Sequence, residues 1–74
     1  MESEWLSFEE SVGRVVAGSV IPYPPGIPLL ISGEMVTEGH IRYLDELLRM
    51  GAKLQGAIRV KEKQLVVVKE GMEE

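Results

Sequence analysis

Tyr23, within a proline-rich stretch, and Glu34, six residues after it, carry side chains that could do chemistry. The stretch PYPPGIP, residues 22–28, holds all four prolines of the 74-residue chain and lies between two apolar runs. Glu34 follows the second run and a glycine, outside any regular charged face. Its carboxylate is either a turn residue near the positive end of the next helix or an acid held at the edge of a cleft. Tyr23 either packs its ring over the prolines or presents its hydroxyl to a ligand or partner.

The remaining polar residues form no catalytic constellation. His40 is the only histidine and the chain has no cysteine, so neither a histidine–cysteine metal site nor a thiol nucleophile is expected. The glycines form no phosphate-binding fingerprint, and the serines have no obvious histidine and aspartate partners. Adjacent acids such as Asp45 and Glu46 point in different directions on a helix, which favours solvated charges over acid–base catalysis. We therefore expect no cofactor and no metal in this chain.

The proline-rich stretch itself predicts a rigid loop. Each proline ring removes a backbone donor and excludes a helix, and residues before proline are pushed into extended conformations. Pro25 and Gly26 fit the central positions of a type II turn, in which glycine supplies the positive φ. The peptide bond between Tyr23 and Pro24 stays open between cis and trans.

The segments on either side of this loop predict short regular elements. The sequence SFEE at residues 7–10 has the form of a capping box, with Ser7 as the N-cap of a helix at residues 8–12. β-Branched and apolar residues predict one strand at residues 14–21 and a second at residues 28–32. The proline loop would join these two strands.

A longer helix and a hairpin are expected in the second half of the chain. Thr37 is a plausible N-cap for a helix whose apolar residues recur at helical spacing, and Gly51 lies where this helix should end. The sequences LQGAIRV, KEK and QLVVVK predict a strand, a turn and a return strand within residues 54–69. Residues 1–6 and 70–74 are expected to fray.

The length and the net charge of the chain limit the folds and functions that are possible. A chain of this length is one domain at most, so residues 1–74 are expected to form a single small α+β domain. We expect two helices, a short mixed sheet of about four strands and the rigid proline loop. The net charge of −4 argues against nucleic-acid binding, and the apolar runs are too short or too broken to span a bilayer. No signal peptide is visible, and the expected location is the cytoplasm.

The most specific motif is VIPYPPGIPLLISGE, residues 20–34. It resembles the region I-x-P-Y-P-P-G-I-P-x-x-x-P-G-E in the C-terminal domain of the Orn/Lys/Arg decarboxylases, which are large bacterial-type pyridoxal-phosphate enzymes. The flanking segments FEESVGRVVAGSV and MVTEGHIRYLDELLRMGAKLQG are similar to the family's segments entering and leaving the motif, so the resemblance covers residues 7–58. Ser32 stands where the family usually has proline, which loosens the turn but keeps the position of the glutamate.

The resemblance implies an accessory domain of an enzyme. The parent would be a pyridoxal-phosphate-dependent decarboxylase of lysine, arginine or ornithine, and this domain would line its active-site entrance without being catalytic alone. Glu34 would border the substrate channel, where a carboxylate suits the distal cation of a basic amino acid. The other residues that the resemblance places at the channel are Tyr23, Pro24, Pro25 and Gly26. The implied partners are the cofactor-binding core of the parent enzyme and its dimer mate.

One departure from the family separates this chain from a complete enzyme. The family's Schiff-base lysine lies in an S-x-H-K sequence, and no lysine here follows a histidine. The chain therefore looks like a C-terminal domain separated from its core, and it should expose an apolar patch around Trp5, Tyr23 and Ile27. Two other interpretations stay open: a free-standing interaction module that docks a protein partner through the proline loop, and a structural domain that buries part of an oligomer interface.

Overall fold

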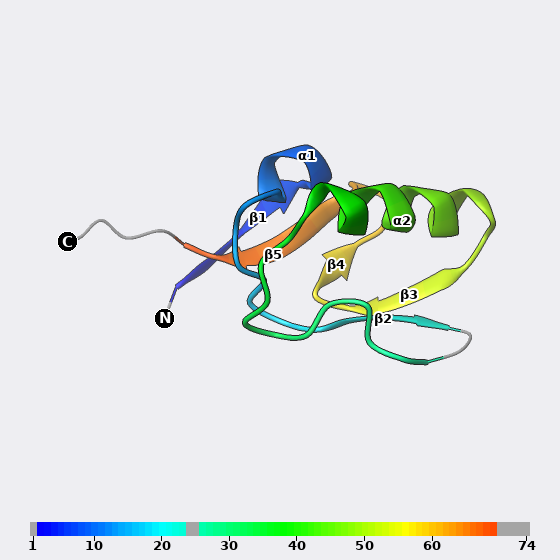
Figure 1. Ribbon diagram of the computed structural model, residues 1–74, viewed down its shortest axis with the longest axis horizontal. Coiled ribbons are helices and arrows are strands. Elements are labelled where there is room, and N and C mark those ends of the chain that lie inside the picture. Colours follow the sequence, from blue (N-terminus) through cyan, green and yellow to red (C-terminus); the bar gives the residue numbers. More distant parts are fainter. Residues whose placement is uncertain (1, 24–25, 70–74) are drawn as a thin grey trace.

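The computed structural model describes residues 2–23 and 26–69. This part of the chain forms two helices and five strands, and the α+β class expected from the sequence is confirmed (Figure 1). The elements are β1 Ser3–Ser7, α1 Phe8–Ser11, β2 Val20–Tyr23, α2 Glu38–Arg49, β3 Lys53–Gly56, β4 Ile58–Arg59 and β5 Gln64–Val68. Residues 70–74, which were expected to fray, lie outside the described residues.

The strands form two antiparallel sheets where one short mixed sheet was expected. One sheet has the order β1-β5-β4, and the other pairs β2 with β3. The predicted hairpin is therefore divided, because β4 pairs with β5 while β3 joins β2. The change of partner occurs at Gly56, whose φ of +105° turns the chain. The next amide, that of Ala57, donates a hydrogen bond to the Ser19 carbonyl at 2.8 Å and so links the two sheets.

Residues 3–7 form strand β1, although residues 1–6 were expected to fray, and Met1 lies outside the described residues. Ser3–Ser7 pair with β5 along their whole length. Arg14 reinforces this edge, because its guanidinium donates to Glu4 Oε2 at 2.8 Å and to the Val68 carbonyl at 3.0 Å. The partner strand lies at the other end of the sequence, so the local composition of this segment did not reveal the pairing.

Both helices begin where the sequence predicts. The Ser7 hydroxyl accepts a hydrogen bond from the Glu10 amide at 3.2 Å, and α1 ends at Ser11. At α2, the Thr37 hydroxyl accepts from the His40 amide at 3.2 Å, and His40 Nδ1 accepts from the Thr37 amide at 3.0 Å. The single histidine therefore completes a capping box, a role in which glutamate or glutamine is more common.

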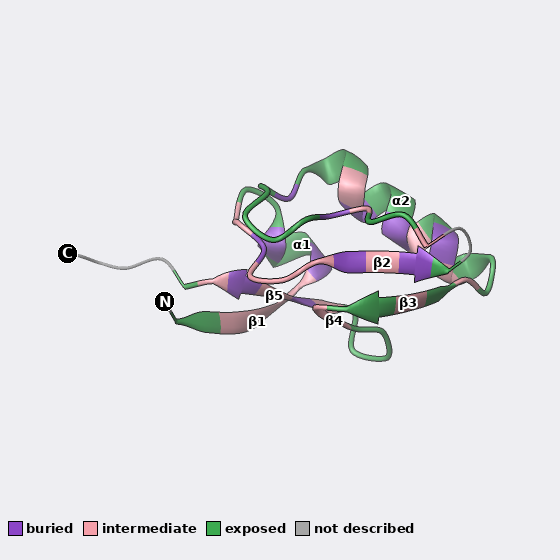
Figure 2. Cartoon of the chain, turned by 90° about the horizontal axis from the view of Figure 1, so that it is seen from below, coloured by how far each residue is buried: buried purple, intermediate pink, exposed green. Residues whose placement is uncertain are grey.

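Helix α2 turns its apolar face toward the two sheets. Ile41, Leu44 and Leu47 are buried on this face, which Figure 2 shows next to the strands. The helix ends at its C-cap Met50, and Gly51 follows in the left-handed conformation with a φ of +81°, as predicted. Within residues 2–23 and 26–69, no helix combines the length and the apolar character needed to cross a membrane.

The two segments that flank the proline loop run antiparallel, and we call them the ribbon (residues 14–23 and 26–36). Val20 pairs with Leu30 through an isolated bridge, and only β2 is a regular strand. The two strands expected here are therefore mostly irregular, because prolines and glycines interrupt the regular hydrogen-bond ladder. In Figure 1 the ribbon extends from near β5 to the end of β2.

The core lies between the ribbon, α2 and β5. Leu30 of the ribbon, Leu44 of α2 and Leu65 of β5 are fully buried. The buried core cluster comprises Phe8, Val16, Val20, Leu30, Val36, Ile41, Leu44 and Leu65. Four of these eight residues come from the ribbon, so its irregular backbone is held in place by the same apolar packing that holds the helix.

Candidate functional site

Tyr23 lies at the end of β2 and packs against the proline loop. Its side chain is 44% exposed, and its ring covers Gly26, where an added methyl group would come within 3.0 Å of Tyr23 Cε1. Gly26 has the predicted positive φ, +87°, and its amide donates to the Pro22 carbonyl at 2.8 Å. The Tyr23 ring thus packs within the loop against Gly26, and a role for its hydroxyl stays a prediction. Pro24 and Pro25 lie outside the described residues, as do the type II turn and the peptide bond between Tyr23 and Pro24.

Glu34 closes a tight turn at residues 31–34. Its Oε1 accepts a hydrogen bond from the Ile31 amide at 2.9 Å, and its own amide donates to the Ile31 carbonyl at 2.9 Å. The Ser32 amide donates to Ser19 Oγ at 3.2 Å, which ties the turn to the other segment of the ribbon. The side chain of Glu34 remains exposed. The Glu34 carboxylate is thus part of the turn, which is the first of the two roles expected from the sequence, and it is also exposed to solvent.

The structure places Glu34 and Tyr23 at opposite ends of the ribbon. The Glu34 carbonyl accepts from the Val16 amide at 2.9 Å, and Val16 in turn bridges Val67 of β5. Tyr23 lies at the far end of β2, opposite Lys53 of β3. Any surface that uses both residues must therefore extend along the whole ribbon.

Exposed apolar side chains gather on the ribbon. Tyr23 and Ile27 are 44% and 66% exposed, in line with the expected patch, and Ile31 and Met35 add 53% and 58%. Ile31 and Met35 were not predicted to be exposed. Ile31 follows the fully buried Leu30, and Met35 precedes the fully buried Val36. Successive side chains of an extended chain point to opposite faces, so these pairs of apolar neighbours were the signal in the sequence.

Trp5 does not belong to this exposed patch, which corrects the sequence-based expectation. It lies on β1 and is only partly exposed. The guanidinium of Arg59, on β4, lies 4.1 Å from the centre of its ring. β1 and β4 flank β5 on opposite sides, so this cation–π contact crosses the sheet.

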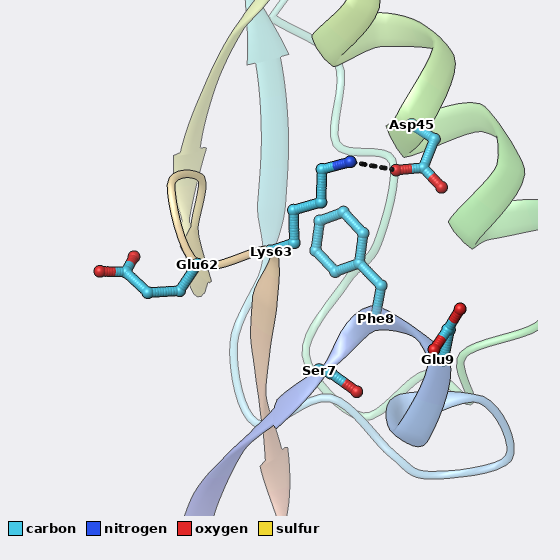
Figure 3. Close-up of a pocket in the computed structure, with 6 residues that line it drawn as sticks. All are labelled: Ser7, Phe8, Glu9, Asp45, Glu62 and Lys63. Atoms are coloured by element: carbon cyan, nitrogen blue, oxygen red, sulfur yellow. Dashed lines mark ion pairs between the residues drawn. The ribbon is translucent and has the colours of Figure 1, made fainter.

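A second feature of the surface is a depression of about 270 Å³ beside the start of α1. Its lining residues are Ser7, Phe8, Glu9, Asp45, Glu62 and Lys63 (Figure 3). Figure 3 shows Lys63 reaching past the Phe8 ring to Asp45, while Glu62 points away. The Lys63 ammonium lies 3.5 Å from Asp45 Oδ1, so the positive charge at this site is already balanced.

The depression beside α1 does not fit pyridoxal phosphate. In the depression, Asp45 and Glu9 place negative charge around Lys63, and this charge repels a phosphate group. The lysines are all exposed side chains, at positions Lys53, Lys61, Lys63 and Lys69. Within residues 2–23 and 26–69, no group of three or more histidine, cysteine, aspartate or glutamate side chains could hold a metal ion.

Known proteins match both the sequence and the fold. The family model "Orn/Lys/Arg decarboxylase, C-terminal domain" matches residues 1–62. The chain is 46% identical over 66 residues to the Bacillus subtilis protein YaaO, and 45% identical over 69 residues to the arginine decarboxylase of Halalkalibacterium halodurans. The solved structure of the Escherichia coli constitutive lysine decarboxylase has a TM-score of 0.74 and 34% identity, over 92% of this chain and 11% of that one.

These matches place a small α+β domain with an apolar ribbon in a known family. The chain belongs to the Orn/Lys/Arg decarboxylase C-terminal domain family. The resemblance seen in the proline motif is thereby confirmed. The alignments with YaaO and with the arginine decarboxylase include 89% and 93% of this chain. They include only 14% of the length of either relative. The free-standing interaction module is not favoured by these matches.

Proposed function

We propose that this chain is the C-terminal accessory domain of a pyridoxal-phosphate-dependent decarboxylase of basic amino acids, and that its ribbon packs against the catalytic core. The observation that carries the proposal is the apolar surface of the ribbon. Tyr23, Ile27, Ile31 and Met35 are all about half exposed or more. The chain also spans only 14% of the arginine decarboxylase that it matches, which leaves room for a core large enough to cover these side chains.

The ribbon is suited to docking because its backbone is already fixed. Ile31 lies in a turn that is closed by Glu34 and tied to Ser19. A pre-organised surface loses little conformational entropy when a partner covers it. Burying one aliphatic side chain contributes about 1.5–3 kcal/mol, so the exposed residues of the ribbon are enough to hold the domain on a core to which it is covalently joined.

The reaction itself belongs to the core in this proposal. The α-carboxylate of the substrate leaves as carbon dioxide, and a proton takes its place on the α-carbon. Pyridoxal phosphate, when bound in the core, takes up the electrons of the broken bond. This chain contributes part of the wall of the active-site entrance. The enzyme would work in the cytoplasm.

We place Glu34 on that wall, as the group that meets the distal cation of the substrate. Its Oε1 is held by the Ile31 amide, which fixes the direction of the carboxylate while its charge remains exposed. Ammonium and guanidinium groups make strong charge-assisted hydrogen bonds with such a carboxylate. Tyr23 and Gly26 would form the other end of the same wall, because the ribbon extends between them and Glu34. The family resemblance adds Pro24 and Pro25 to that end, and these two lie outside the described residues.

A hybrid enzyme tests the proposal. In this hybrid, our chain replaces the matching 69-residue segment of the Halalkalibacterium halodurans arginine decarboxylase. We expect the hybrid to decarboxylate arginine and the enzyme without this segment to lose most of that activity. Equal activity of the truncated enzyme and the hybrid would contradict a role at the active-site entrance.

A pair of substitutions in the hybrid tests the docking surface. Ile27→Glu places a charge in the apolar face of the ribbon and should release the domain, seen as faster protease cleavage between core and domain. Tyr43→Glu is the matched control, because Tyr43 is 49% exposed on α2 and lies outside the ribbon. If both variants are cleaved at the same rate, the ribbon is not the docking face.

A further inference from the structure

A groove lies between the turn at residues 31–34 and the end of β5. It has a volume of about 410 Å³ and is separate from the depression shown in Figure 3. Its lining residues are Glu2, Val15, Val16, Ala17, Ser32, Gly33 and Val68. Three valines and an alanine form most of this wall, so the groove is mainly apolar.

The groove stays open at Gly33. This residue has a φ of +98°, and no heavy atom lies within 4 Å of the position that a Cβ would occupy. The floor below it is fixed by two backbone hydrogen bonds that join the ribbon to β5. The Ala17 amide donates to the Val66 carbonyl at 2.9 Å, and the Val68 amide donates to the Val15 carbonyl at 2.7 Å. The groove is thus preformed.

The backbone groups around the groove are already used within the domain. The Gly33 amide donates to the Val16 carbonyl at 3.0 Å, and the Val16 amide donates to the Glu34 carbonyl at 2.9 Å. An anion would need free amides that converge on it, and these amides point elsewhere. An apolar side chain needs only the apolar wall, so the groove suits such a group better than it suits an anion.

We propose that this groove receives an apolar side chain of the catalytic core. The inference rests on the proposed function and names one contact within it. Two observations favour the core as the occupant. The exposed Ile31 precedes the groove residue Ser32, and the exposed Met35 bridges the groove residue Val15, so apolar side chains of the ribbon border the groove. The chain also spans only 14% of the arginine decarboxylase that it matches, so a core large enough to supply the side chain is available there.

Filling the groove in the hybrid enzyme tests the contact. Ala17→Phe fills it from the floor, and Ser32→Phe covers it from an exposed position where no core packing is disturbed. Ala17→Ser keeps the groove open, and Gln55→Phe adds the same ring at an exposed position on β3, outside the groove. The readout is the rate of protease cleavage between core and domain.

We expect both filling variants to be cleaved about tenfold faster than the hybrid, and both controls to stay within about twofold of it. If both filling variants are as protected as the hybrid, the groove is not occupied by the core. Because Ser32 is exposed, the Ser32→Phe result stands even if Ala17→Phe fails to fold. Failure of the parent hybrid to be active and protected would instead overturn the proposed function, so the two failures are distinguishable.

Discussion

Gly56 lies directly against the carbonyl oxygen of Ser19, so close that a Cβ at Gly56 would overlap that oxygen. The contact occurs where the chain leaves the β2–β3 sheet for the β1-β5-β4 sheet. The Ser19 carbonyl also accepts a hydrogen bond from the Ala57 amide at 2.8 Å. Only glycine fits at this crossing, because the backbone there has both a positive φ and no room for a side chain.

We predict that Gly56→Ala lowers the free energy of unfolding by about 3 kcal/mol or more, since it adds a steric overlap to the cost of a left-handed alanine. Gly51→Ala is the control. Its φ of +81° carries a similar backbone cost, but no atom lies within 4 Å of the added methyl group, so we expect a loss of about 1–2 kcal/mol. Urea denaturation of the chain measures both. Equal losses would show that the overlap is relieved by a small backbone shift.

The cap of α2 gives a second prediction. Thr37→Ala removes the hydroxyl that accepts from the His40 amide, and we expect it to cost about 1 kcal/mol. Thr37→Ser keeps the hydroxyl and should cost much less. His40→Gln should also be mild, because glutamine can accept from the Thr37 amide as the imidazole does. The order of the three midpoints in urea tests the capping box, and a Thr37→Ser variant as weak as Thr37→Ala would speak against it.

Two substitutions of Glu34 separate its structural role from its proposed charge role. Glu34→Gln keeps an oxygen for the Ile31 amide but removes the charge, so in the hybrid enzyme it should raise the KM for arginine by about tenfold with the domain still docked. Glu34→Ala removes the acceptor as well and should also speed protease cleavage between core and domain. Steady-state kinetics and cleavage rates distinguish the two effects. Unchanged KM and kcat in Glu34→Gln would remove Glu34 from the substrate path.

Arg14 is expected to hold the edge of the β1-β5-β4 sheet. Its guanidinium bonds Glu4 on β1 and the Val68 carbonyl on β5, and its side chain is only 17% exposed. Arg14→Lys keeps the charge, but the lysine ammonium ends one bond short of the guanidinium nitrogen that makes both hydrogen bonds, so we expect a loss of about 1–2 kcal/mol. Hydrogen exchange of the β1 amides should quicken more than that of the α2 amides. A uniform change in both would place the effect elsewhere.

Local features of the chain were open to sequence reasoning, because each depends on neighbours within a few residues. The caps at Ser7 and Thr37, the left-handed Gly51 and the positive φ of Gly26 all fall in this class. The helical spacing of apolar residues in α2 and the proline motif that resembles the decarboxylase family are equally local. Neither needs knowledge of which segments meet in space.

The tertiary structure alone decided which segments meet. β3 joins β2 and not β5, and residues 3–7 form a strand because β5 offers an edge to them. It also separated Tyr23 from Glu34 along the ribbon and opened the groove beside Gly33. Such pairings depend on competition between distant segments for the same buried edges, and the free energy of that competition comes from packing the whole core. A short stretch of sequence therefore does not reveal which segments will pair.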